Sequence, residues 1–200
     1  MGKLVVTEFI SLDGVIEDPG GGEKKSARSA FEHGGWAFEF DRGDEGNQIK
    51  NDELMAADAQ LLGRITWEGF AKAWPAMRAT TGEFGEKMNA MPKYLVSATM
   101  SDKDATWENS KVIRGDVRAE VERLKKNVKG DILVAGSATL VRSLTDYGLV
   151  DLYRLMVYPV VLGTGKRLFE GGLPKTKLRL VESKPVGPDG VLVLTYERQA

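Results

Sequence analysis

A tight corner at Gly136-Ser137 carries the first residues whose types and spacing suggest ligand chemistry. The stretch DILVAGSATLVRSL combines a short apolar run, a Gly-Ser break and apolar residues at helical spacing. A helix that begins directly after a strand points its free N–H groups and positive dipole end at the strand's carboxyl end, which favours a phosphate. Gly136 permits close approach, and Ser137 can cap the helix or donate to a ligand. The same pattern is also typical of a compact turn that binds nothing.

A second strand-to-helix corner has the same organisation. In LLGRITWEGF, Gly63 follows an apolar run, Arg64 stands beside it and Thr66 lies at the expected helix start. Arg64 supplies a permanent cation whose planar donor fork matches phosphate oxygens. A third strand end, YLVSATM, offers the hydroxyls of Ser97 and Thr99. Three such ends favour a ligand lying across one edge of an α/β sheet; the alternative is a surface arginine with ordinary helix caps.

These corners require strands that alternate with helices. Short apolar runs rich in β-branched residues predict strands over residues 4–10, 58–62, 93–97, 111–113 and 131–135. Apolar residues between 117 and 128 fall on one helical stripe, with Asp116 as the expected N-cap. A shorter helix is expected over residues 139–145. The alternation predicts a largely parallel sheet with helices on its faces.

The last quarter of the chain predicts antiparallel strands. Residues 152–161 form a long apolar run, and residues 177–183 and 191–197 flank PVGPDG, a sequence suited to a hairpin turn. Because Pro159 lacks an N–H group, the run that contains it must bend there or lie at a sheet edge.

Composition excludes several classes of protein. A formal net charge of −1 provides no overall field that would gather nucleic acid or anionic lipid. The absence of cysteine excludes disulfides and thiolate metal sites, and the sequence has neither a signal-peptide pattern nor a membrane-length apolar run. We therefore expect a cytoplasmic protein without nucleic-acid or membrane partners. Residues 1–200 are expected to form one domain, and the glycine-rich segment 18–29 a mobile loop.

Four motifs along the chain resemble segments of known reductases. GRITWEGF is similar to the G-R-x-T-[WY]-E segment of dihydrofolate reductases, and ISLDGVIED resembles the S-L-D-G-x-I opening of the reductase domain of riboflavin biosynthesis. The stretch VAGSATLVRSLTDYGLVDLYRLMVYPVVLGTGKRLFEGG resembles the same domain's glycine corner, helix exit and P-V-x-L-G-x-G-x-x-L-F segment. The resemblance covers nearly the whole chain. The sequence is therefore identified as a member of the dihydrofolate reductase family, of the riboflavin-reductase-like type.

This resemblance implies a three-layer α/β sandwich, with a largely parallel central sheet and a C-terminal antiparallel hairpin. It also implies an NAD(P)H-dependent reductase of a small conjugated heterocycle, pterin-like or pyrimidine-like. By this likeness the residues that contact NADPH are Val15 and Ile16 beside the nicotinamide, Gly63, Arg64 and Thr66 at the phosphates, Ser97 near the adenosine 2′-phosphate, and Gly136, Ser137, Ala138 and Thr139 around the pyrophosphate. Ala98 stands where relatives often have a second basic or polar residue, which leaves NADH possible.

Hydride transfer also needs a group that polarises or protonates the acceptor. The candidates are the N-terminal carboxylates Asp13, Glu17, Glu32, Asp41 and Asp44. Asp13 is the first choice for the catalytic residue, although an Asp before Gly14 is equally typical of a structural turn. Three nearby aromatic residues, Trp36, Phe38 and Phe40, either stack on a ligand or pack a loop onto the core. The single histidine, His33, has no partner at ligand spacing, so no metal site is expected.

Two questions stay open at this point. The chain is either a reductase or a non-catalytic nucleotide-binding or regulatory protein on the same fold. The apolar run 152–161 predicts a homodimer, because it offers more apolar surface than one sheet face requires and because related reductase domains commonly pair through C-terminal strands. The alternative is a central strand buried on both faces within one protomer.

Overall fold

Strand β1 (Leu4–Ser11) lies inside the sheet, and seven of its eight residues are buried. Burial of consecutive residues is typical of a parallel strand that is covered by helices on each side. The computed structural model describes residues 1–21 and 31–199. Most of segment 18–29, for which the sequence predicts a mobile loop, lies outside these residues.

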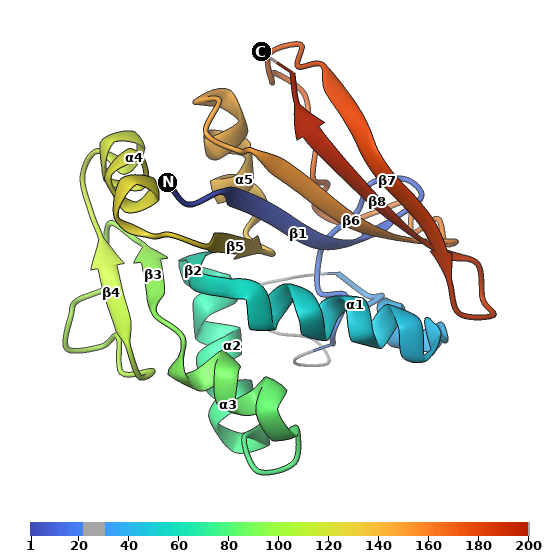
Figure 1. Cartoon of the computed structure of the whole chain (residues 1–200), viewed down its shortest axis with the longest axis horizontal. Helices are drawn as coiled ribbons and strands as arrows, with labels where there is room; N and C mark the ends of the chain where they lie inside the picture. Colours follow the sequence, from blue (N-terminus) through green and yellow to red (C-terminus); the bar gives the residue numbers. More distant parts are fainter. Residues whose placement is uncertain (22–30, 200) are drawn as a thin grey trace.

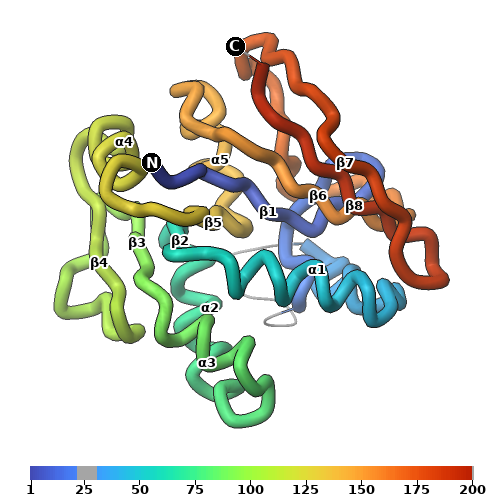
Figure 2. The backbone as a smooth tube through the Cα atoms, viewed as in Figure 1, coloured from blue at the N-terminus to red at the C-terminus, as the bar shows by residue number. Residues whose placement is uncertain are grey.

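The described residues form one sheet of eight strands in the order β4-β3-β2-β5-β1-β6-β8-β7. Beyond β1, the strands are β2 (Ala57–Gly63), β3 (Lys93–Val96), β4 (Ser110–Ile113), β5 (Asp131–Ala135), β6 (Leu152–Tyr158), β7 (Leu178–Val186) and β8 (Val191–Arg198). The first six strands pair in parallel, whereas β8 runs antiparallel to both β6 and β7. Figure 2 shows the resulting path, with the C-terminal hairpin at one end of the sheet and β4 at the other.

Helices cover both faces of the sheet (Figure 1). One face carries α1 (Gly43–Ala56), α2 (Arg64–Met77) and α3 (Gly82–Ala90), and the other carries α4 (Val117–Asn127) and α5 (Ala138–Asp146). Leu54, Trp67 and Met88 pack in the core beneath the first three helices, and Val121 and Leu144 pack in the core beneath the other two. A short 3₁₀ helix, η1 (Trp36–Glu39), precedes α1. The predicted three-layer α/β fold with a C-terminal hairpin is confirmed.

Helix α1 is an element that the sequence patterns did not predict. Its buried residues include Glu53, and Lys50 on the same face is half-buried, so the apolar stripe that marks other helices is weak here. The segment that resembles a polar loop in sequence is therefore a helix that presents charged side chains to the sheet.

Strand β6 accounts for the long apolar run at residues 152–161. It lies between β1 and β8, and the strand ends at Tyr158, immediately before Pro159. Four of the seven β6 residues are buried, so much of the apolar run is used inside the protomer, whereas Val161 beyond the strand is exposed. The homodimer stays a prediction, and the apolar run of residues 152–161 by itself is no argument for it. In the residues that the structure describes, none of the helices is long and apolar enough to span a membrane.

The predicted N-cap of α4 gives the first test. Asp116 Oδ1 accepts a hydrogen bond from the N–H of Ala119 at 3.1 Å. We expect Asp116→Ala to lower the free energy of unfolding by about 1 kcal/mol, because an N–H group at the helix start loses its acceptor. Asp116→Ser should retain most of the stability in the same chemical denaturation experiment. An Asp116→Ala protein as stable as the wild type would contradict this role of the cap.

Candidate functional site

The carboxyl ends of β2 and β5 meet at one edge of the sheet because these neighbouring strands run in parallel. Gln60 pairs with Leu133, so Gly63 at the end of β2 comes level with Gly136, the first residue after β5. Each strand leads into a helix, α2 after Gly63 and α5 after Ser137. The two corners that the sequence singled out therefore lie side by side.

The hydroxyl of Ser137 joins these corners. Ser137 Oγ accepts a hydrogen bond from the N–H of Gly63 at 2.9 Å and donates one to Thr66 Oγ1 at 2.9 Å. The same hydroxyl makes no capping bond to α5. The first-turn N–H groups of that helix consequently lack the acceptor that a capping serine would supply.

The close approach of the corners explains their glycines. Gly136 has φ +58°, and a Cβ atom there would lie 2.8 Å from Thr66 Oγ1. A Cβ atom at Gly63 would lie 3.0 Å from Ser137 Oγ. Ser137 itself adopts the left-handed conformation with φ +61°, which is uncommon for a serine. Side chains at either glycine would push the corners apart.

Arg64 reaches from the start of α2 toward the end of β3. Its Nη1 donates to Thr99 Oγ1 at 2.6 Å, and its Nε donates to Glu68 Oε1 at 2.7 Å. Ser97 Oγ accepts from the N–H groups of Thr99 and Met100, so this hydroxyl stabilises the turn after β3. The Arg64 side chain remains 42% exposed and its cation is accessible to an anionic ligand at this edge.

The remaining predicted contacts differ in exposure. Ala138 is half-buried and Thr139 is exposed in the first turn of α5, beside the Ser137 corner. Val15 and Ile16 are buried, and their backbone N–H groups donate to Ser11 Oγ and to the carbonyl of Lys166. Contact between these two side chains and a ligand stays a prediction.

Asp13 is an acceptor in a dense set of hydrogen bonds. Its Oδ1 accepts from Ser11 Oγ at 2.7 Å and the N–H of Leu162 at 3.1 Å, and its Oδ2 accepts from the N–H of Gly163 at 2.9 Å and from Arg167 Nη2 at 3.3 Å. The bond from Ser11 and the two backbone bonds outweigh the effect of burial and hold the pKa of Asp13 well below its usual range. Four donors fill the acceptor sites of an ionised carboxylate. This geometry favours an anchoring role, and the catalytic assignment of Asp13 stays a prediction.

A buried charged cluster between β1 and α1 was missed by the sequence patterns. Thr7 Oγ1 donates to Glu53 Oε2 at 2.7 Å, and Lys50 Nζ contacts both groups. Arg154 Nη1 lies 3.6 Å from Glu53 Oε1, and its Nη2 lies 3.2 Å from Asp131. The only signal in the sequence is the spacing of three between Lys50 and Glu53, which places them on one helix face.

The pKa of Glu53 reflects this cluster. Burial by itself would raise it, but the charge of Lys50, the hydrogen bonds from Lys50 and Thr7 and the charge of Arg154 lower it below its usual value. Thr7 pairs with Ala135, the residue before Gly136, so the Lys50 ammonium lies on the α1 face of the sheet close to the glycine corners.

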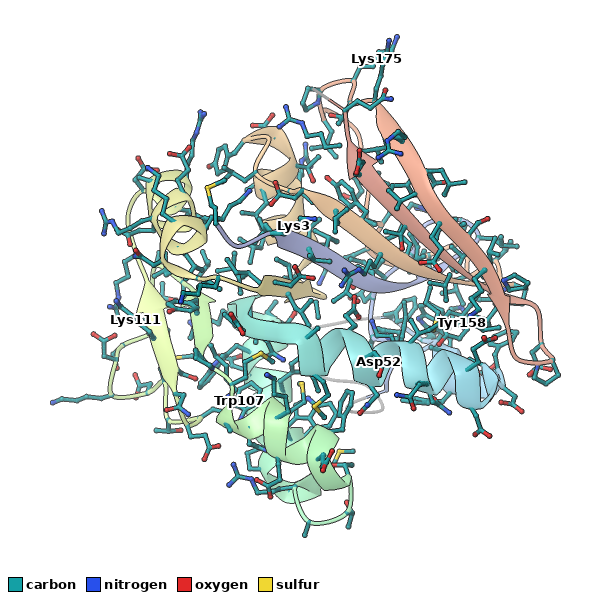
Figure 3. The ribbon with its side chains drawn as sticks, viewed as in Figure 1. Lys3, Asp52, Trp107, Lys111, Tyr158 and Lys175 are labelled. Atoms are coloured by element: carbon teal, nitrogen blue, oxygen red, sulfur yellow. The ribbon has the colours of Figure 1, made fainter. Side chains whose placement is uncertain are left out.

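Aromatic side chains close the other side of this cluster. Arg42 and Lys50 lie over the Phe9 ring, at 4.9 and 5.6 Å from its centroid. Trp36 and Tyr158 meet edge to face, and Figure 3 shows Tyr158 between the sheet and α1. Trp36 is 1% exposed, so it packs the loop onto the core, whereas Phe38 is 68% exposed.

Comparison with known proteins extends over nearly the whole chain. The family model of the RibD C-terminal domain matches residues 2–192. The uncharacterized protein YyaP of Bacillus subtilis is 31% identical over 147 residues, which is 72% of this chain and 76% of that protein.

Two solved structures share the fold. A putative riboflavin biosynthesis protein from Shewanella sp. PV-4 has a TM-score of 0.72 at 18% identity and covers 99% of both chains. Dihydrofolate reductase from Enterococcus faecalis, solved in complex with NADP(H), has a TM-score of 0.58 at 14% identity and covers 99% of this chain and 97% of that one. The resemblance found in the sequence motifs is confirmed, and the chain belongs to the RibD C-terminal domain family.

Proposed function

We propose that the chain is an NAD(P)H-dependent reductase that acts on a small conjugated heterocycle, pterin-like or pyrimidine-like. The observation that carries the proposal is the joined pair of glycine corners, with the uncapped start of α5 and the exposed cation of Arg64 beside it. A bound nicotinamide would supply a hydride to the acceptor. A dinucleotide site on the same fold in the Enterococcus dihydrofolate reductase supports this cofactor.

The donor groups at the corners fit the phosphates of such a cofactor. The N–H groups of Ala138 and Thr139 open α5, where the helix dipole favours an anion. Arg64 adds a charged donor from the neighbouring corner. Gly136 leaves no Cβ atom between the two corners, so Thr66 can pack against it and the donors of the two corners stay together. These groups bind and orient the ligand.

On the acceptor side, Lys50 is a stronger candidate for the proton donor than Asp13. Asp13 is held as an ionised carboxylate, which has no proton to donate near neutral pH. Lys50 has three potential donors on Nζ, and Glu53 and Thr7 hold it against the residue of β1 that pairs with Ala135, next to Gly136. In this role Lys50 transfers a proton to a heteroatom of the acceptor and regains one from solvent. Glu53 is the positioning residue for that ammonium group.

Oxidation of NADPH in the presence of a panel of pterins and pyrimidines tests the proposal. We expect at least one acceptor to be reduced in step with the fall in NADPH absorbance. Binding of NADPH without oxidation by any acceptor would favour a non-catalytic nucleotide-binding protein instead. The cytoplasmic location and the homodimer stay predictions.

Replacement of Arg64 tests the cofactor side. We expect Arg64→Ala to weaken NADPH binding by roughly ten- to hundredfold, because a charge-assisted hydrogen bond to phosphate is lost. Arg118 offers a matched control, since it pairs with Glu122 at the same i,i+4 spacing on α4, as Arg64 does with Glu68. Arg118→Ala should leave the dissociation constant unchanged in the same fluorescence titration. Equal affinity of Arg64→Ala and the wild type would remove Arg64 from the site.

Replacement of Lys50 and Asp13 separates the two candidate proton donors. We expect Lys50→Met to lower kcat by about a hundredfold or more while NADPH affinity changes little, because a positioned proton donor is lost. Asp13→Asn should lower the free energy of unfolding and leave kcat of the folded protein nearly unchanged, since it weakens the hydrogen bonds that hold the turn after β1. Steady-state kinetics and denaturation of both folded variants provide the comparison. A large fall in kcat for Asp13→Asn with little change for Lys50→Met would instead identify Asp13 as the proton donor.

A further inference from the structure

Glu8 is a buried carboxyl group behind the glycine corner that the proposed function does not use. It lies on β1 between Thr7, which pairs with Ala135, and Phe9, so it is level with Gly136. Its Oε2 accepts a hydrogen bond from the N–H of Gly136 at 3.0 Å. Its Oε1 is buried and has no hydrogen-bond partner among the residues that the structure describes. Glu8 is 4% exposed, so an unpartnered acidic oxygen sits in the protein interior at the corner.

Strand alternation places Glu8 on the opposite face of β1 from the charged cluster. Thr7 points to the α1 face, where it meets Lys50 and Glu53, and the next residue points to the opposite face. Val6 and Ile10 have the same parity as Glu8 and belong to the core beneath α4 and α5. Glu8 therefore lies on the face of β1 that packs against this apolar core, with the Gly136 amide as its hydrogen-bond donor.

This setting favours the neutral acid. Burial raises the pKa of Glu8 well above its usual range, against the hydrogen bond from Gly136 and the positive charge of Lys50. The negative charge of Glu53, from the same helix as Lys50, raises it further. On the flanking strands, Leu155 of β6 and Gly136 beyond β5 are the neighbours of Glu8, and neither carries a charge.

An anion at the start of α5 would act on the same carboxyl group. A phosphate bound to the first-turn N–H groups and an ionised Glu8 would share one positive helix end, and two like charges in a poorly solvated region disfavour each other. A neutral Glu8 avoids this repulsion and still accepts the Gly136 N–H bond, which holds the corner in its left-handed conformation.

We propose that Glu8 is a positioning residue that must carry a proton for a diphosphate ligand to bind at the Gly136–Thr139 corner. Protein whose Glu8 is ionised takes up one proton from solvent when the ligand binds. The proposal rests on the proposed function for the identity of the ligand, a dinucleotide, but concerns the binding step and not the reduction.

The pH dependence of NADPH affinity tests this coupling. For the wild type, the dissociation constant should rise about tenfold per pH unit above the pKa of Glu8 in the free protein. Glu8→Gln is a neutral variant of the same shape that keeps an acceptor for Gly136, so its affinity should not show this rise. The ratio of the two dissociation constants cancels the titration of the ligand's own 2′-phosphate. Identical profiles for the two proteins would overturn the proposal and leave the cofactor assignment intact.

Calorimetry of the wild type alone gives a second readout. At a pH where affinity falls, the heat of NADPH binding should depend on the ionisation enthalpy of the buffer and report uptake of up to one proton. A heat that is independent of the buffer across the pH range in which affinity falls would overturn the coupling. Absence of NADPH binding to either protein at every pH would instead contradict the proposed function; inorganic pyrophosphate then serves as the probe in the same two experiments, with the same outcomes deciding on Glu8.

Stability provides a check that needs no ligand. The pKa of Glu8 is raised in the folded protein, so the unfolded chain releases this proton first as the pH rises. The wild type should therefore lose stability relative to Glu8→Gln from about pH 4.5 upward, until the folded carboxyl also ionises. A constant difference between the two denaturation free energies across this range would show that Glu8 is not held neutral and would overturn the proposal.

Discussion

The contact between the ends of β2 and β5 is the constraint on which the candidate site depends. One hydroxyl, that of Ser137, bonds to Gly63 of the first corner and to Thr66 of the helix that follows it. Because the hydroxyl is used across the corners, it does not cap α5, and the first turn of that helix has no side-chain cap. The same contact requires glycine at both corners, since a Cβ atom at Gly136 would lie 2.8 Å from Thr66 Oγ1. The bonds of the Ser137 hydroxyl thus explain both the close packing of the two corners and the lack of a side-chain cap on α5.

Strand β1 distributes buried charge to the two faces of the sheet. Thr7 faces α1 and joins the Lys50–Glu53 pair, whose charges compensate each other. Glu8 faces the opposite core, where no cation within hydrogen-bond reach is described and burial dominates its ionisation. A buried carboxyl with a close cation stays ionised, whereas one without it favours the proton. Adjacent residues of one strand therefore have opposite preferences, and both lie level with the glycine corner at β5.

The end of β1 is held by a separate set of contacts. Asp13 ties the turn after β1 to the segment that follows β6 through Leu162, Gly163 and Arg167. Asp13, the acidic residue of the S-L-D-G-x-I motif, thereby holds these two segments together. The proton donor that we propose, Lys50 of α1, instead contacts Thr7 and Glu53.

Local sequence determined most of the elements and both corners. Strand and helix periodicity, the Asp116 cap and the glycines at positions 63 and 136 are short-range signals, since each reflects backbone conformation or one face of one element. The structure confirms the sheet they predict. Helix α1 was not predicted because charged residues are among those that face the sheet. The hydrogen bonds of the Ser137 hydroxyl were not predicted because its partners, Gly63 and Thr66, are more than seventy residues away in the chain. Burial of Glu8 and the saturation of Asp13 likewise depend on neighbours from distant segments. Ionisation and hydrogen-bond satisfaction are set by all the groups packed around an atom, so only the tertiary structure decided them.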